Sequence, residues 1–217
     1  MTTASVGRRA PVQERSRQTV SRILEAAAEI ADELGADAVT TRSVADRAGV
    51  SYPSLYRFFP DREAILEGLL EKLTEELDAR CIAAEQTWTI TSVEQLLNNE
   101  IDLHITYYTE HPVVPRMWMG GHTSPAVTAY VRARMRALAN RMHTLLVDAG
   151  LIPADTEPLS MLVVVEMGDR VLELAYRNSA DGGFDPEILA VGRRALIAAC
   201  RDLAQDLAED RGPHRPR

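Results

Sequence analysis

The sequence predicts an all-α fold, with three helices in an N-terminal domain and six in a C-terminal domain. Ala, Leu, Glu and Arg, all good helix formers, are abundant among the 217 residues. Apolar residues recur every three or four positions along most of the chain, and no segment keeps a strand-like alternation. Gly and Pro residues lie between these periodic runs, where helices end.

The N-terminal domain begins with a long amphipathic helix. Its apolar residues recur at helical spacing from Val20 to Leu34, and Gly35 ends the run. Residues 39–62 follow as two short helices with a tight turn at Gly49, because glycine adopts the left-handed backbone of a helix end at least cost.

Caps support the two short helices. Thr40 or Thr41 can cap the first by accepting a backbone N–H, and Ser51 can cap the second. Pro53 is tolerated because it falls in the first turn of the second helix. This is the pattern of a helix-turn-helix, which places its second helix in the DNA major groove. A plain helical hairpin is the alternative, but it needs neither the glycine turn nor two outward-facing tyrosines.

Six further helices are predicted after the helix-turn-helix. The first has an apolar stripe and would link the two domains, and segments rich in Gly, Pro or polar residues separate the others. The helices are expected at residues 61–81, 93–109, 113–119, 124–149, 159–178 and 186–208, with breaks at 87–91, 153–158 and 179–183.

The expected domain organisation has four parts. Residues 1–14 form a disordered basic arm and residues 209–217 a disordered tail. The helix-turn-helix domain occupies residues 15–62, and the second helical domain occupies residues 63–208.

The charge distribution bears on DNA binding. The net charge is −8, yet residues 1–62 hold nine Arg and eight acidic residues and are close to neutral. An acidic protein is a poor nonspecific binder of polyanions, so DNA affinity must come from local arginines. The candidates are Arg8, Arg9, Arg15, Arg17, Arg42, Arg57 and Arg62. For Arg8 and Arg9, a solubilising tail is an equal alternative.

The composition argues against several classes of protein. Two cysteines are too few for a disulfide framework and suit a reducing cytoplasm. We find no signal peptide and no apolar run near ~18–20 residues, so neither a membrane span nor a membrane partner is expected. The five histidines lack metal-ligand spacing, and motifs for phosphate binding or hydrolysis are missing from the sequence. We therefore expect no metal, no cofactor and no enzyme activity.

Residues 16–70 closely resemble the DNA-binding domain of the tetracycline-repressor (TetR) family. The family often has a small or basic residue at the position of Tyr52, and usually Lys at that of Arg62. Beyond about residue 75 the resemblance is architectural. The matching residues are Thr41-Arg42, Ala45-x-x-Ala48-Gly49-Val50-Ser51, Leu55-Tyr56-x-x-Phe59 and Arg62.

The resemblance implies a ligand-responsive transcriptional regulator, most often a repressor, that binds double-stranded operator DNA. Phosphate contacts set affinity and base contacts set sequence choice. By this resemblance, Tyr52, Pro53 and Ser54 lie at base edges, and Arg57 is free to meet DNA. The residues expected at phosphates are Thr41, Arg42, Tyr56 and Arg62.

The second domain contains candidates for an effector pocket at residues 96–176, gated near Trp118. Pockets are mostly apolar with a few polar groups, and Met adapts to varied shapes. The alternative is that these side chains simply fill the core. The effector would be a small, largely hydrophobic molecule with at least one polar group. The candidate lining residues are His104, Tyr107, Tyr108, Met117, Trp118, His122, Met135, Met142, Met167 and Arg170.

The last two helices are expected to form a homodimer. Apolar residues occur on more than one face of each helix, and a large exposed apolar patch is rare on a monomer. Two such helices pairing with their copies give a two-fold, four-helix interface. A merely buried helix pair is the alternative. The candidate interface residues are Leu159, Val163, Val171, Leu189, Leu196 and Leu203.

The main functional alternative is a constitutive DNA-binding or architectural protein without an effector. A fully packed second domain would favour that class, and a cavity would favour the regulator. A helical enzyme is the class with least support in the sequence.

Overall fold

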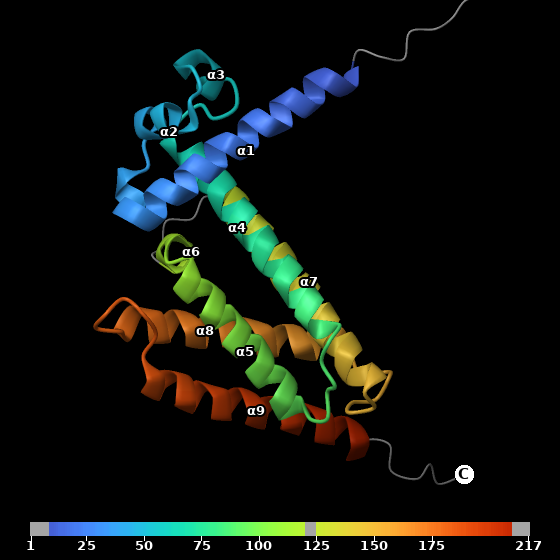
Figure 1. Ribbon diagram of the computed structural model, residues 1–217. Coiled ribbons are helices and arrows are strands. Elements are labelled where there is room, and N and C mark those ends of the chain that lie inside the picture. Colours follow the sequence, from blue (N-terminus) through green and yellow to red (C-terminus); the bar gives the residue numbers. More distant parts are fainter. Residues whose placement is uncertain (1–8, 120–124, 210–217) are drawn as a thin grey trace, which may run out of the picture. The chain divides into compact units, whose positions relative to one another are not determined.

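The structure is a computed structural model that describes residues 9–119 and 125–209, with side chains described at 14–119 and 128–201. All regular elements in these residues are helical, as the sequence predicts (Figure 1). A 3₁₀ turn at Ala36–Ala38 follows the first helix. The α-helices are α1 (Arg9–Leu34), α2 (Thr41–Ala48), α3 (Tyr52–Tyr56), α4 (Arg62–Glu85), α5 (Val93–Glu110), α6 (Val113–Trp118), α7 (Pro125–Asp148), α8 (Pro158–Asn178) and α9 (Pro186–Glu209).

The first of two compact units contains Met1–Glu76 and His111–Met117. Close packing at Gly68 brings α4 against its neighbours in this unit. A Cβ at Gly68 would lie 3.0 Å from the ring of Phe59 and 3.2 Å from a methyl carbon of Leu24, so any larger residue would force them apart. The core side chains include Ile23, Ala27, Ile30, Val44, Leu55, Ile65 and Leu69.

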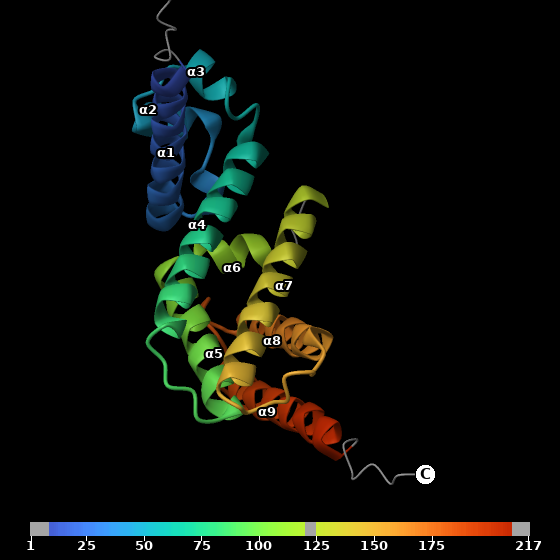
Figure 2. The same cartoon turned by 90° about the vertical axis from the view of Figure 1, so that its right-hand side faces the viewer.

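The second unit contains Leu77–Glu110 and Trp118–Arg217. Helix α8 packs against both α7 and α9, and both views show α8 and α9 side by side (Figures 1 and 2). At Gly192 the two helices are so close that a Cβ would fall 2.2 Å from a methyl carbon of Val171. Glycine therefore allows α9 to pack on α8.

Two boundaries differ from those expected. Helix α1 begins at Arg9, so residues 9–14 are helical rather than part of a disordered arm. Pro11 is compatible with this because a first-turn proline removes no intrahelical hydrogen bond. The compact units divide within α4, after Glu76, rather than at residue 62, because the first turns of α4 complete the N-terminal core.

The expected terminal segments are only partly described. Residues 1–8 of the arm and 210–217 of the tail lie outside the described residues, and α9 reaches Glu209. Within the described part of the chain, every helix is too short or too polar to cross a membrane.

Candidate DNA-binding surface and effector cavity

The helix-turn-helix follows the caps and the glycine that the sequence contains. Thr40 and Ser43 form a capping box, in which each side chain accepts the backbone N–H of the other at 3.0 Å. Gly49 has φ 62°, the left-handed conformation predicted for the turn. Asp61 caps α4 by accepting a backbone N–H at 2.8 Å. Ser51 precedes α3 but makes no cap bond through its side chain.

Helices α2 and α3 expose polar and aromatic side chains, as a surface that reads DNA requires. Tyr52 is 42% exposed and Tyr56 is 50% exposed. Of the other candidates on these helices and the turn after α3, Thr41 and Ser54 are half-buried, and Arg42, Pro53 and Arg57 are exposed.

Both tyrosine hydroxyls have partners within the helix-turn-helix. Tyr52 donates a hydrogen bond to Oδ1 of Asp46 at 3.0 Å, and the hydroxyls of Tyr56 and Thr41 lie 3.2 Å apart. The bond to the Asp46 carboxylate raises the pKa of Tyr52, so this phenol stays protonated at neutral pH. These bonds fix the two rings in defined orientations on the exposed surface.

Arg62 is engaged within the protein. Its Nε donates to the carbonyl of Val39 at 2.8 Å, and its Nη2 donates to the carbonyl of Ala36 at 3.0 Å. The same guanidinium lies 3.7 Å from Asp37. These bonds anchor the start of α4 to the 3₁₀ turn between α1 and α2. The resemblance assigns Arg62 a phosphate contact, whereas its observed geometry gives it a structural task.

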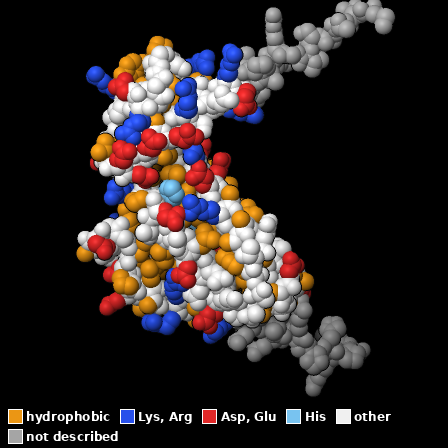
Figure 3. Space-filling model, viewed as in Figure 1, with side chains coloured by type: hydrophobic (Ala, Val, Ile, Leu, Met, Phe, Trp, Pro, Cys, Tyr) orange, Lys and Arg blue, Asp and Glu red, His pale blue; other side chains and the backbone are white. Residues whose placement is uncertain are grey.

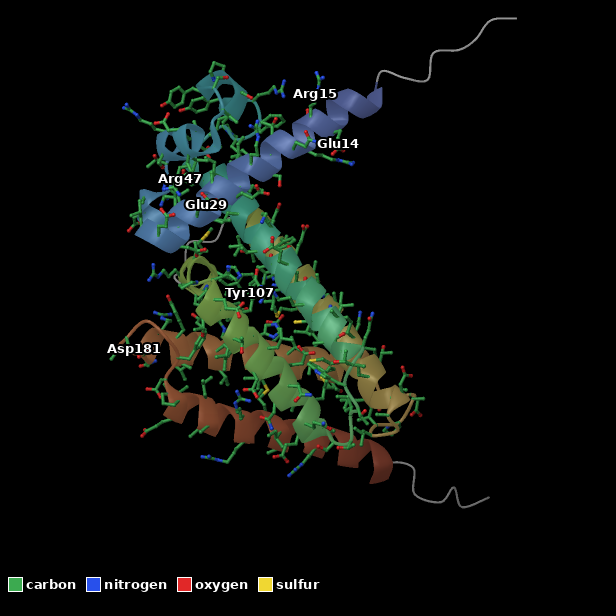
Figure 4. The ribbon with its side chains drawn as sticks, viewed as in Figure 1. Glu14, Arg15, Glu29, Arg47, Tyr107 and Asp181 are labelled. Carbon is green, nitrogen blue, oxygen red and sulfur yellow. The ribbon has the colours of Figure 1, made fainter. Side chains whose placement is uncertain are left out.

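The other arginines of the helix-turn-helix fall into two groups. Arg47 of α2 points toward Glu29 of α1, at 3.3 Å, and pairs with Glu33 at 2.9 Å (Figure 4). These ion pairs join α2 to α1 and occupy the guanidinium. Arg57 lies over the ring of Phe58, 4.5 Å from its centre, and remains exposed together with Arg42.

A cavity of about 60 Å³ lies among α5, α7, α8 and α9 of the second unit. An engineered cavity that holds benzene has about 150 Å³, so this one must widen to admit most organic ligands. The lining is apolar except for Glu100, His104, Tyr108 and Asp169. The lining residues are Leu97, Glu100, Ile101, His104, Tyr108, Met135, Leu138, Met142, Val164, Val165, Gly168, Asp169, Leu172 and Leu196.

Four predicted pocket residues line this cavity: His104, Tyr108, Met135 and Met142. The Trp118 indole donates to Oδ1 of Asp169 at 3.2 Å, so it contacts a lining residue without lining the cavity itself.

The other predicted pocket residues lie elsewhere. Tyr107 of α5 is buried with Arg80 over its ring at 4.9 Å (Figure 4). Met117 is in the first unit. Met167 and Arg170 are exposed, because they lie on the face of α8 that points away from the cavity. His122 lies outside the described residues.

Beside the cavity, α4 and α7 are joined by two buried or half-buried ion pairs. Arg134 binds both oxygens of Asp78 at 2.8 and 2.9 Å, and Arg141 Nε lies 3.1 and 3.2 Å from the oxygens of Glu85. The two acids are seven residues apart on α4 and the two arginines are seven residues apart on α7, which is about two helical turns in each case. Each acid here is matched by one arginine.

Glu100 has no such match. It is 4% exposed, and neither carboxylate oxygen has a hydrogen-bond partner in the described part of the protein. Burial, followed by the nearby Glu85 carboxylate, raises the pKa of Glu100 to about 8. Glu100 was not predicted from the sequence, although its place between Leu97 and His104 on the buried face of α5 was a usable signal.

Glu100 and His104 have opposite effects on how the stability of the protein depends on pH. The folded pKa of Glu100 lies above its ordinary value of 4.5, so stability from this group falls as pH rises from there to about 8. Burial lowers the pKa of His104 from 6.5 to about 4, so stability from this group falls as pH drops through that window. Above pH 6.5, therefore, only the Glu100 effect remains.

One group of possible metal ligands occurs among the described residues. Donor atoms of Cys81, Glu100 and His104 lie within 4.8 Å of one another, and all three residues are buried. His104 Nδ1 is already hydrogen-bonded to the backbone carbonyl of Glu100 at 2.8 Å. Burial raises the pKa of the Cys81 thiol, so it stays protonated and is a weak ligand at neutral pH.

The predicted dimer residues divide into exposed and internal ones. Leu159 is 60% exposed and Val163 is 49% exposed, as an interface requires, and Leu189 is half-buried. Leu196 is buried and lines the cavity, so its assignment to the interface is wrong. The Val171 side chain packs on Gly192 within the same chain. The side chain of Leu203 lies outside the described residues.

Comparison with known proteins identifies the helix-turn-helix. The model of the family described as "Bacterial regulatory proteins, tetR family" matches residues 23–69, from the middle of α1 into α4. Residues 23–69 are therefore a TetR-type DNA-binding domain. The fold agrees, because a TetR-family transcriptional regulator from Streptomyces coelicolor is 29% identical with a TM-score of 0.58. That similarity covers 87% of this chain and 98% of the Streptomyces protein.

The chain is also similar to two other regulators or DNA-linked factors. Nucleoid occlusion factor SlmA of Vibrio vulnificus is 31% identical over 112 residues, which is 51% of this chain and 55% of SlmA. The chain thus matches about half the length of this curated relative. FadR from Bacillus subtilis, solved with stearoyl-CoA, shares the fold at 17% identity and a TM-score of 0.59, over 82% of this chain and 98% of FadR. TetR-family proteins are regulators rather than enzymes, as predicted.

Proposed function

We propose that this protein is a ligand-responsive transcriptional repressor of the TetR family. In this proposal, a homodimer binds a palindromic operator through α2 and α3, and a small molecule in the α5–α9 cavity releases it. The observation that carries the proposal is the presence, in one chain, of a TetR-type helix-turn-helix and a cavity in the second unit.

The exposed residues of α2 and α3 support DNA recognition. Arg42 and Arg57 supply positive charge to phosphates, which sets affinity and its salt dependence. Tyr52, Pro53 and Ser54 lie on the short helix that would enter the major groove, where side chains read base edges. The hydrogen bond from Tyr52 to Asp46 orients the ring before DNA arrives.

The cavity supports effector control. Helix α4 is continuous from Arg62, in the DNA-binding unit, to Glu85, which pairs with α7 beside the cavity. A ligand that widens the cavity by displacing α7 would strain the ion pairs between α7 and α4. If the effector binds better to the widened state, it shifts the protein away from the DNA-binding state.

An exposed apolar stripe on α8 supports dimerisation. Leu159, Val163, Met167 and Leu174 are 39–60% exposed, and their spacing of four, four and seven places them on one helix face. Val191 on α9 is 57% exposed. Hydrophobic side chains are visible on the surface of this unit in Figure 3. A second copy would cover the stripe, and a two-fold dimer needs a palindromic operator.

A second candidate is a DNA-binding factor that works without an effector, as the constitutive alternative holds. The match to nucleoid occlusion factor SlmA favours it, since that relative is named for a chromosome-linked role rather than for gene control. The cavity favours the effector-controlled regulator instead. The two differ in one measurable respect, because only the regulator loses DNA affinity when the cavity is filled.

Selection of binding sites from random DNA tests DNA recognition. The full-length protein should enrich a palindrome whose half-sites lie ~34–36 Å or a multiple apart. Arg42→Ala should weaken binding to every sequence, while Arg136→Ala, which removes an exposed arginine of α7, serves as the matched control. Failure to enrich any sequence would contradict a sequence-specific regulator.

A small-molecule screen tests the effector. Compounds that release the operator should also stabilise the free protein, by about 2.7 kcal/mol at a hundredfold excess over Kd. In a Trp88→Phe variant, fluorescence of Trp118 should respond, because its indole donates to the cavity residue Asp169. If compounds release DNA without binding this cavity, the site is elsewhere.

A further inference from the structure

We propose that the effector carries a cationic, hydrogen-bond-donating group, an ammonium or amidinium, that binds the carboxylate of Glu100. An apolar body on the same molecule would lie against Met135, Met142 and their neighbours. The inference rests on the proposed function, because it treats the cavity as the effector site. It specifies the chemical class that the site selects.

The unpartnered carboxylate is the first support. Glu100 projects from the buried face of α5 into an apolar cavity, with 4% of its surface exposed and no hydrogen-bond partner for either oxygen in the described residues. A buried polar group without a partner destabilises the protein, and a charged one does so more strongly. A ligand that donates hydrogen bonds to Glu100 relieves this destabilisation, so it gains affinity that an apolar ligand lacks.

The neighbouring charges are the second support. Asp78 and Glu85 already bind Arg134 and Arg141, at 2.8–3.2 Å. Arg141 is not among the residues that line the cavity, although its Nη2 has no hydrogen-bond partner in the described residues. Both arginines of the cluster thus pair with acids other than Glu100. When Glu100 is ionised, a cationic ligand would balance its charge.

The other lining residues are the third support. Lys and Arg are absent from the described lining, and burial keeps His104 neutral at pH 7 because its pKa is about 4. Asp169 adds a second carboxyl, which accepts the Trp118 indole N–H. A carboxylate-bearing ligand would meet two acids and no cation in this lining. Such a ligand would be repelled once Glu100 is ionised.

The size and composition of the cavity limit the apolar part of the ligand. At about 60 Å³ the cavity fits only a few atoms, so a ligand must displace flexible side chains. Met135 and Met142 are the unbranched lining residues best able to move. A compact hydrocarbon body of one ring would fit with such movement.

Binding should depend on pH, because a cation binds only the ionised form of Glu100, whose pKa is about 8. Affinity for an amine should therefore rise from pH 6.5 to 8, with release of a proton. The ionisable groups around Glu100 are Asp78, Cys81 and Glu85 on α4, His104 on α5, Arg134 and Arg141 on α7, and Asp169 on α8.

The test uses three probes on one carbon skeleton: cyclohexylmethylamine, cyclohexylmethanol and cyclohexanecarboxylate. Binding to the full-length protein is measured by calorimetry and thermal shift at pH 7.5. We expect the amine to bind best and the carboxylate worst. Glu100→Gln keeps the shape but loses the charge, and should weaken amine binding about ten- to hundredfold while leaving the alcohol unchanged. Glu166→Gln, at an exposed acid of α8 outside the cavity, is the matched control.

Several results would overturn the inference. If the carboxylate or the alcohol binds best, the preference for a cation is wrong, but the cavity is still supported as the effector site. An unchanged amine affinity in Glu100→Gln would also overturn the inference. Tight binding of Zn²⁺ or Co²⁺ that Cys81→Ser abolishes, with Cys200→Ser as control, would assign Glu100 to a metal site instead. If all three probes fail to bind, the inference is wrong, and the proposed function falls only if the operator-release screen is also blank.

Discussion

Replacing Arg62 separates a structural role from a DNA-contacting one. The resemblance to the TetR family assigns this residue to a phosphate. In the structure its guanidinium donates to the carbonyls of Ala36 and Val39, and those bonds hold the start of α4. We therefore expect Arg62→Ala to lower the free energy of unfolding rather than to remove a phosphate contact.

The magnitude follows from the two lost bonds. A hydrogen bond to a charged group contributes about 1.5–3 kcal/mol. The Arg62 side chain keeps 34% of its surface exposed, so water replaces part of each bond. The fully exposed Asp37 adds little, as surface ion pairs contribute about 0–1 kcal/mol. The expected loss is therefore about 2 kcal/mol in total, or a fall in Tm of roughly 4–8 °C for a chain of this size.

Two measurements are needed on three variants. Urea unfolding reports the stability change, and operator affinity at several salt concentrations reports phosphate contacts. Arg42→Ala should reduce the slope of log K against log salt by about 0.9, whereas Arg62→Ala should leave it unchanged. Arg62→Lys keeps the charge but lacks the planar donor pair, so it should lose stability and keep the slope. A reduced slope with unchanged stability in Arg62→Ala would refute the structural role.

Three further predictions concern the recognition helix, the dimer and pH. Tyr52→Ala should change the bases preferred in a binding-site selection, whereas Tyr52→Phe, which loses the hydroxyl that binds Asp46, should lower stability only slightly and keep the preference. Val163→Arg with Leu174→Arg should give folded monomers by sedimentation, while Leu196→Arg should unfold the protein, and a monomeric wild type at micromolar concentration would contradict the interface. Glu100→Gln should abolish the fall in stability between pH 6.5 and 8, measured by urea unfolding, and an undiminished fall would argue against the raised pKa.

Local chemistry made the helix-turn-helix predictable. The Thr40 cap, the left-handed Gly49 and the Asp61 cap each act within four residues, so the sequence alone contains the needed information. The role of Arg62 could not be predicted from local sequence patterns. Its partners lie 23 and 26 residues earlier, and only the folded N-terminal unit brings those carbonyls to its guanidinium.

The second unit was predictable as helices but less so as a site. Helical spacing identified His104, Tyr108, Met135 and Met142 as buried side chains, and these line the cavity. The same spacing placed apolar residues on two faces of α9, so it did not decide whether Leu196 faces the core or a partner subunit. Its direction is decided by Gly192, which lets α9 approach α8 closely and turns the Leu196 face toward the cavity. Such a choice depends on helix pairing that periodicity does not encode.

Glu100 shows most clearly what the three-dimensional arrangement adds. Sequence spacing places it on the buried face of α5, but a buried acid is neutralised if an arginine reaches it. Arg134 and Arg141 could each have done so, and the fold instead gives them Asp78 and Glu85. The cluster then holds three acids against two arginines. Because the third acid faces the cavity and has a pKa of about 8, an entering cation would balance the charge of its ionised form, as the proposed selectivity requires.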